Sequence, residues 1–276
     1  MTEPGGAGGN LPAWSEPFVA ERRADLLRQP PVAVDRAAVF GRADGRSVSV
    51  AIVDSGIERS HPAVGGRVVR AVRVELVDGQ PRVVDDPDPN DPVGHGTACA
   101  GIVHGLAPSA DLVSVRVLGA DNRAPGVLFA AAIEWVAEQR IPVANLSLSS
   151  RREALFAAFH DLADEAYFAN TLLVCAANNL AGPSYPSLFA SVVSVAAHDT
   201  PDPWTWFYNP RPPVEFGAWG VDVPVAWKGG ARIVATGNSL AAPHVTGLAA
   251  LIRSVHPDAS PFEVKALLAA TASRST

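Results

Sequence analysis

The sequence is poor in charge and has no long apolar run. Only 18% of its 276 residues are charged, and 28 acids against 22 bases give a formal net charge of −6. An acidic chain without a basic run is a poor candidate for binding nucleic-acid phosphates. No stretch approaches ~18 uninterrupted apolar residues, so the sequence predicts no membrane span. Because 48% of the residues are hydrophobic, the chain can bury a large core, and a disordered chain or a coiled coil is excluded.

Cysteine is scarce as well. Cys99 and Cys175 are the two cysteines, too few for a disulfide framework. Residues 1–17 have neither the basic nor the apolar region of a signal peptide, so we expect a cytoplasmic protein. No H-E-x-x-H or C-x-x-C spacing is present, so a zinc site is not expected. We expect no cofactor and assign no residue as a metal ligand.

What is present is an alternation of short apolar strands and helices. We expect strands at 47–54, 68–77, 111–118, 142–148, 171–176 and 191–196, and helices at 95–106, 126–139, 152–168, 239–254 (broken early by a proline) and 261–270. Residues 78–94 are expected to form a loop and 204–230 an irregular segment. Strands without period-2 alternation are typical of a mostly parallel sheet covered on both faces. The predicted fold is therefore α/β, with three layers and a mostly parallel central sheet.

The chain shows no internal repeat and no second region of distinct amino-acid composition. Residues 1–45 are rich in Gly, Pro and Ala, with one amphipathic stretch at 18–29, and are interpreted as an N-terminal extension or arm. Residues 46–276 are expected to form a single domain.

Three reactive side chains stand at the edges of predicted elements. Asp54 ends the first apolar strand, and His95 and Ser239 each open a helix beside glycine. Sites in parallel sheets form beyond the carboxyl ends of the strands. A serine hydroxyl is a weak nucleophile that needs a base, and an imidazole base needs an orienting carboxylate. These residues therefore predict a catalytic triad, with helix-start N–H groups near Ser239 to hold an oxyanion.

The motifs around these residues are D-S-G-I-x-x-x-H-P, G-H-G-T-x-x-A-G and G-x-S-x-A-A-P-H-V. In this order they resemble the subtilisin-like serine proteases, over about residues 48–270. The resemblance implies a subtilisin-like fold and a serine endopeptidase acting on peptide or protein substrates through an acyl-enzyme. It also implies that Asn179 is the oxyanion donor. Substrate-binding roles are implied for five further residues, Ser147, Leu148, Ser149, Ala177 and Asn178.

The chain departs from the family pattern near the nucleophile and in the expected specificity pocket. Ser149, Ser150 and Asn178 stand where the family usually has glycine, which suggests a narrower and more polar pocket. Asn238 and Leu240 stand where the family has Thr and Met. Residues 102–110 are too short for the family's strong calcium loop, so that site is expected to be missing.

An acidic run precedes His95. It consists of Asp85, Asp86, Asp88 and Asp91. These carboxylates either form a solvated loop, ligate calcium or favour basic residues in the substrate.

Cys99, one helical turn after His95, is either a buried small hydrophobe or a source of thiol sensitivity. Four tryptophans fall between 204 and 227, namely Trp204, Trp206, Trp219 and Trp227. They are either a packed cover over the sheet or an aromatic wall for a peptide.

The sequence thus predicts an intracellular processing endopeptidase acting on a restricted precursor peptide. The 53 residues before Asp54 are expected to be too few for a signal peptide and an inhibitory prosegment together. Two alternatives stay open: an acyl-enzyme transferase that ligates or macrocyclises peptides, and a non-catalytic peptide-binding homologue. Neither a nucleic-acid nor a membrane partner is expected, and the oligomeric state is left open.

Overall fold

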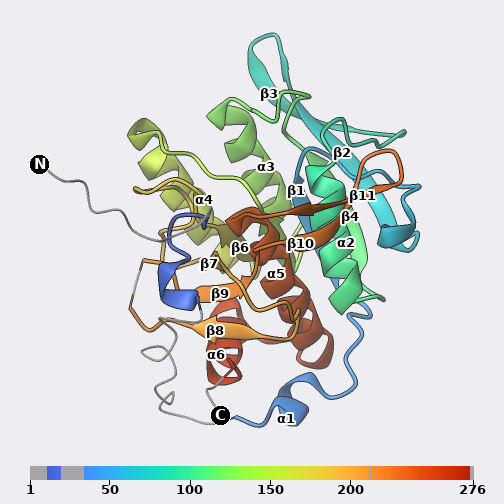
Figure 1. Ribbon diagram of the computed structural model, residues 1–276. Helices are drawn as coiled ribbons and strands as arrows, with labels where there is room; N and C mark the ends of the chain where they lie inside the picture. The colour runs from blue at the N-terminus through green and yellow to red at the C-terminus, as the bar shows by residue number, and fades with distance from the viewer. Residues whose placement is uncertain (1–10, 20–33, 212, 274–276) are drawn as a thin grey trace, which may run out of the picture.

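The computed structural model describes residues 11–19, 34–211 and 213–273. A nine-stranded sheet with the order β3-β2-β4-β1-β5-β6-β7-β9-β8 crosses it (Figure 1). Its strands are β1 Ser49–Asp54, β2 Val68–Val77, β3 Gln80–Asp85, β4 Asp111–Arg116, β5 Val143–Leu146, β6 Leu172–Ala176, β7 Val193–His198, β8 Trp206–Tyr208 and β9 Phe216–Trp219. All neighbours pair in parallel except the edge strands β3 and β8. The predicted α/β class with a mostly parallel sheet is confirmed.

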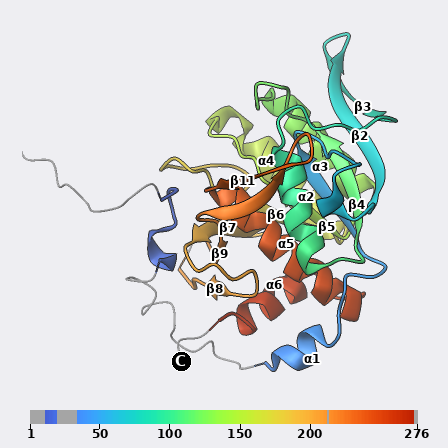
Figure 2. The same ribbon diagram turned by 45° about the vertical axis from the view of Figure 1, so that its right-hand side comes forward.

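Helices cover both faces of the sheet, as Figures 1 and 2 show. The helices are α1 Arg36–Phe40, α2 His95–Leu106, α3 Gly126–Glu138, α4 Phe156–Phe168, α5 Asn238–Val255 and α6 Pro261–Ala270. In β1, Val50 and Ile52 join the core on the α2–α5 side, whereas Ala51 and Val53 join the core on the α3–α4 side. Because both faces are buried, the strand is a continuous apolar run rather than an alternating one.

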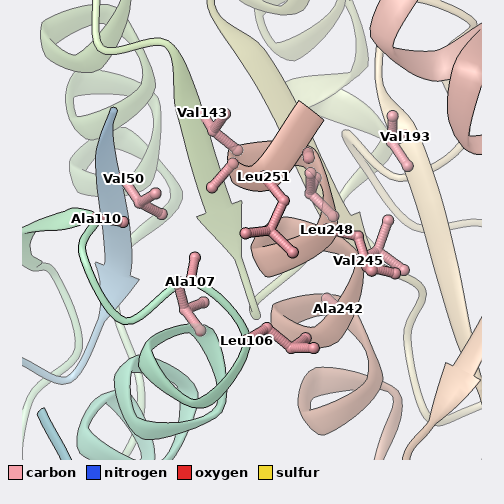
Figure 3. Close-up of a cluster of buried hydrophobic side chains, with 14 of the residues drawn as sticks. Val50, Leu106, Ala107, Ala110, Val143, Val193, Ala242, Val245, Leu248 and Leu251 are labelled. Atoms are coloured by element: carbon pink, nitrogen blue, oxygen red, sulfur yellow. The ribbon is translucent and has the colours of Figure 1, made fainter. Parts of the chain in front are cut away.

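Helix α5 passes through the centre of one core layer, and 15 of its 18 residues are buried. Figure 3 shows Leu248 and Leu251 of this helix packed near Val143 of β5, with Leu106 of α2 alongside. Gly247 lets the two helices approach, because a Cβ there would lie 2.9 Å from the Leu106 Cβ. The predicted break at Pro243 is wrong, since α5 is continuous through it.

Two segments predicted as irregular contain strands. Within 78–94, β3 pairs with β2 through a tight turn in which Asp78 and Gly79 have φ of 52° and 76°. An Asp-Gly turn between apolar runs is a hairpin signal, and Pro81 is tolerated because β3 is an edge strand. Within 204–230 lie β8, β9 and β10 (Val223–Trp227), which pairs with β11 (Ala231–Ala235) in a separate two-stranded sheet. Such short, proline-flanked strands carry little periodicity.

The helices predicted at 95–106 and 261–270 have those bounds in the structure. In the segment preceding the domain, α1 packs beside α5, and Arg36 donates from Nε to the carbonyl of Thr271 at 2.7 Å. Most of the amphipathic stretch at 18–29 lies outside the described residues, and the division at residue 45 stays a prediction. Among the helices of the described ranges, none has the length and apolar content needed to cross a membrane.

Candidate active site

The structure brings together the three residues that the motifs single out. Nδ1 of His95 lies 2.8 and 2.9 Å from the two carboxylate oxygens of Asp54, and its Nε2 lies 2.9 Å from Oγ of Ser239. Asp54 is fully buried. With Nδ1–H donating to the carboxylate, Nε2 is free to accept the serine proton. The geometry is that of a Ser–His–Asp nucleophilic triad.

The sheet topology places Asp54. β1 lies between β4 and β5, so the chain order reverses at this strand, and Asp54 stands at its carboxyl end, where α/β sheets form their crevice. The N–H of Ser55 donates to Oδ1 of Asp54 at 2.7 Å and fixes the carboxylate. Gly96 is required opposite it, because a Cβ there would lie 2.1 Å from the Gly56 carbonyl.

Asp91 organises the turn that carries His95, a role the sequence analysis missed. Its buried carboxylate accepts from the N–H groups of Gly94 and Thr97 and from the hydroxyl of Ser55, at 2.7–2.8 Å. The signal was an acid a few residues before a helix start, which is typical of N-terminal capping. Asp91 is therefore neither solvated nor available to a substrate.

Asp86, another acid of this run, also has a structural role. Asp86 is buried and pairs with Arg116 at 3.1 Å and with Arg73 at 3.8 Å. Half of the run is thus used structurally, and Asp85 and Asp88 stay exposed to solvent. Among the described residues, the run forms no cluster of three or more ligand atoms close enough to hold a metal ion.

The nucleophile is held by a buried polar network. Pro243 has no N–H for the carbonyl of Ser239 four residues earlier, and the hydroxyl of Ser147 donates to that carbonyl at 2.8 Å instead. Asn145 donates to Ser147 at 2.8 Å and accepts from Thr246 of α5 at 3.0 Å. Ser147, predicted to bind substrate, thus also anchors the nucleophile, and the contribution of Asn145 and Thr246 was not foreseen.

Asn179, the predicted oxyanion donor, lies beside the hydroxyl of Ser239. Oδ1 of Asn179 accepts from the backbone N–H of Asn238 at 2.9 Å, so its Nδ2 must point the other way. A Cβ at Gly237 would lie 3.2 Å from Oγ of Ser239 and 3.5 Å from Nδ2 of Asn179. Glycine at 237 thus leaves open the space between the nucleophile and the amide, where an oxyanion would form.

A cleft of about 430 Å³ leads away from the triad. Its lining includes all the residues predicted to bind substrate: Ser147, Leu148, Ser149, Ala177 and Asn178, with Ser150, Arg123 and Arg152 further along. Across this cleft Nδ2 of Asn178 donates to Oγ of Ser149 at 3.2 Å, and Oδ1 of Asn178 accepts from the N–H of Leu180 at 2.8 Å. Two of the three residues that replace glycine therefore join the loops after β5 and β6.

Electrostatics favour protonation of the base. Burial lowers the pKa of His95 more than any single neighbour raises it, but the charge of Asp54, the hydrogen bond to it and the contribution of Cys99 together outweigh burial, and the pKa is raised well above its usual 6.5. The side chain of Cys99 contacts this pair, with Sγ 3.7 Å from Oδ2 of Asp54 and 3.4 Å from Oγ of Ser147. Burial raises the pKa of both cysteine thiols, so both are protonated small groups at neutral pH, as the simpler interpretation holds.

Within the described residues, Asp54, His95 and Cys99 are the one group of metal-ligand atoms of these types gathered within 4.8 Å. Its carboxylate and imidazole are already joined in the triad, so we assign it no metal. None of the four tryptophans lines this cleft, so the cleft does not support the aromatic-wall interpretation. Trp206 is instead fully buried, with Nε1 donating to the carbonyl of Leu268 at 2.8 Å.

Comparison with known proteins agrees with the site. Residues 45–276 match the Subtilase family of peptidases. Subtilisin BL from Lederbergia lenta is 32% identical over 239 residues, covering 83% of this chain and 84% of its own. A thermostable alkaline protease from Halalkalibacterium halodurans is 31% identical over 83% of this chain, which spans only 63% of that protein. The crystal structure of a cold-adapted subtilisin-like serine proteinase superposes with a TM-score of 0.69 at 28% identity, over 88% of both chains.

The chain belongs to the subtilase family, and its class is that of a subtilisin-like serine endopeptidase.

Proposed function

We propose that this subtilase is a processing endopeptidase with a restricted peptide substrate. Ser239 attacks the scissile carbonyl while His95 takes its proton and then delivers it to the leaving amine. Asp54 orients His95 and stabilises the imidazolium. Nδ2 of Asn179 and the backbone N–H of Ser239 hold the oxyanion.

The observation that carries the restriction is the hydrogen bond from Asn178 to Ser149. It ties together the two loops that border the cleft beside the nucleophile. A long side chain at the cleaved position would have to break this bond, whereas Gly, Ala or Ser would not. The proposal is therefore that bonds after short side chains are cut in preference to bonds after Phe or Leu.

The charge of the cleft supports a further restriction. Arg123 and Arg152 line it, and no Asp or Glu is among the described residues that do. Both arginines are exposed, and within the described ranges no ion pair joins either guanidinium to a carboxylate. An extended substrate adds as a strand along residues 147–149. Acidic side chains upstream of the cleaved bond would then meet unpaired guanidinium groups.

A peptide library read by mass spectrometry tests this proposal. The library varies the residue before the cut and the four residues upstream, and the Ser239→Ala variant is the matched control. We expect cuts after short residues with Asp or Glu upstream, and none with the variant. Strong preference for Phe or Leu at the cleaved position, uniform digestion of casein, or full cleavage by Ser239→Ala would each contradict the proposal.

The same spectra separate the alternatives. Hydrolysis adds water to the two fragments, whereas a transferase gives a cyclised or ligated product without added water. A protein that only binds peptides gives no product and no labelling of Ser239 by a fluorophosphonate probe. We also propose that the enzyme works in the cytoplasm, a setting compatible with two buried cysteines that remain free thiols.

A further inference from the structure

The N-terminal segment 11–18 lies against the oxyanion side of the site. The N–H of Ala13 donates to the carbonyl of Asn179 at 2.8 Å. The carbonyl of Ala13 accepts from Nδ2 of Asn238 at 2.9 Å, and Oγ of Ser15 donates to Oδ1 of Asn238 at 3.3 Å. A segment more than 160 residues from the oxyanion donor thus contacts both that donor and the residue before the nucleophile.

Most of these hydrogen bonds converge on the side chain of Asn238. It is fully buried, and its Oδ1 also accepts from the N–H of Ala197 at 2.9 Å. Its Nδ2 is also within reach of the carbonyls of Ala177 and Asn178, at 3.2 and 3.3 Å. An NH₂ group has two hydrogens, so the shorter bond to Ala13 takes one of them. The backbone N–H of Asn238 in turn fixes the amide of Asn179.

The segment is built into the domain rather than laid on its surface. Phe18 is fully buried and lies on the backbone of Gly217 in β9, where a Cβ would be 2.4 Å from its ring. Trp14 has φ of 73°, a conformation that is strained for a bulky residue. That φ belongs to a turn closed by the Ser15 N–H and the Pro12 carbonyl at 3.2 Å. The turn presents both backbone groups of Ala13 to the site.

We propose that residues 11–18 are a positioning segment for the oxyanion hole. Through Asn238 and the carbonyl of Asn179, the segment holds the Asn179 amide where its Nδ2 meets the developing charge. This inference rests on the oxyanion role proposed for Asn179. The hydrogen bonds of the segment go to Asn179 and Asn238 and not to Ser239 or His95, and residues 11–18 do not line the cleft. The proposed effect therefore passes through the position of the Asn179 amide.

The test is Ala13→Pro in the full chain. A turn with positive φ only at its third residue, here Trp14, is of type II and favours proline at the second position. The substitution therefore keeps the turn and replaces the N–H that holds Asn179 with a ring methylene, which breaks the hydrogen bond and pushes against the Asn179 carbonyl. Ala13→Ser keeps the N–H and is the matched control. We expect kcat to fall by between about 5-fold, for one lost hydrogen bond, and the ~10²-fold loss of a whole donor, with KM unchanged.

A double-mutant cycle decides whether the effect passes through Asn179. In an Asn179→Ala background, Ala13→Pro should cause no further loss, whereas a general structural defect would add to the first. An unchanged kcat, an equal loss in both backgrounds, or the same loss in Ala13→Ser would overturn the proposal. If Ala13→Pro does not fold, Ser15→Ala with Ser15→Thr as its rescue enters the same cycle. A normal kcat in Asn179→Ala alone would instead overturn the oxyanion assignment.

Discussion

Replacing Asn178 by glycine should widen the enzyme's specificity. The wild-type side chain donates to Ser149 at 3.2 Å, and both residues are half-buried. A bulky substrate side chain would have to break this bond, which contributes about 1 kcal/mol, and leave an amide N–H poorly paired, for about 1 kcal/mol more. The second figure lies at the lower end of its range because water reaches both groups. At ~1.4 kcal/mol per tenfold change, about 2 kcal/mol corresponds to a roughly 30-fold discrimination against a bulky side chain.

The assay is the ratio of kcat/KM for two peptides that differ only in Phe or Ala at the cleaved position. Asn178→Gly should raise this ratio about 30-fold. Ser149→Ala breaks the same hydrogen bond but keeps the Asn178 side chain and its bond to Leu180, so it should give a smaller rise in the same direction. An unchanged ratio in both variants would show that the bond does not restrict the pocket, and a rise in Ser149→Ala alone would place the restriction at Ser149.

Three further outcomes are expected. Asn179→Ala should lower kcat on the order of 10²–10³-fold with little change in KM, a magnitude known for the equivalent donor of subtilisin, another subtilase; stopped-assay kinetics with one chromogenic peptide check it. The pKa of His95 is raised by Asp54 and the base must be neutral, so kcat/KM should rise with pH through a midpoint above 6.5; a midpoint at or below 6.5 contradicts the coupling. Gly96→Ala places a Cβ 2.1 Å from the Gly56 carbonyl, and should lower both the melting temperature and the rate of fluorophosphonate labelling; a variant matching wild type in both refutes the steric argument.

The triad could be found from the sequence because each member carries its own local signal. Asp54 ends an apolar strand, and His95 and Ser239 open helices beside glycine. The same applies to α2, whose glycine-flanked start and apolar body define its bounds. The parallel sheet followed from continuous apolar runs, since both faces of its strands are buried.

The parts that escaped prediction depend on partners far away in the sequence. Asn145 is an ordinary polar residue until the fold places Thr246 within 3.0 Å of it. Asp91 looked like one acid among several, and only its burial among N–H and hydroxyl donors identifies its role. β3 and β8 are short edge strands whose single antiparallel neighbour defines them. Trp206 shows no pattern that distinguishes it from the exposed Trp204.

Ser239 sits at the first turn of α5, and every residue from Leu240 to Arg253 that follows it is buried. Amide hydrogens along such a helix exchange only when the whole domain opens, because no smaller unit can release them. We therefore expect the nucleophile to be attached to the part of the molecule whose local unfolding costs the most free energy. On heating, the reactivity of Ser239 and the slowest amide protons of α5 should be lost in a single cooperative step.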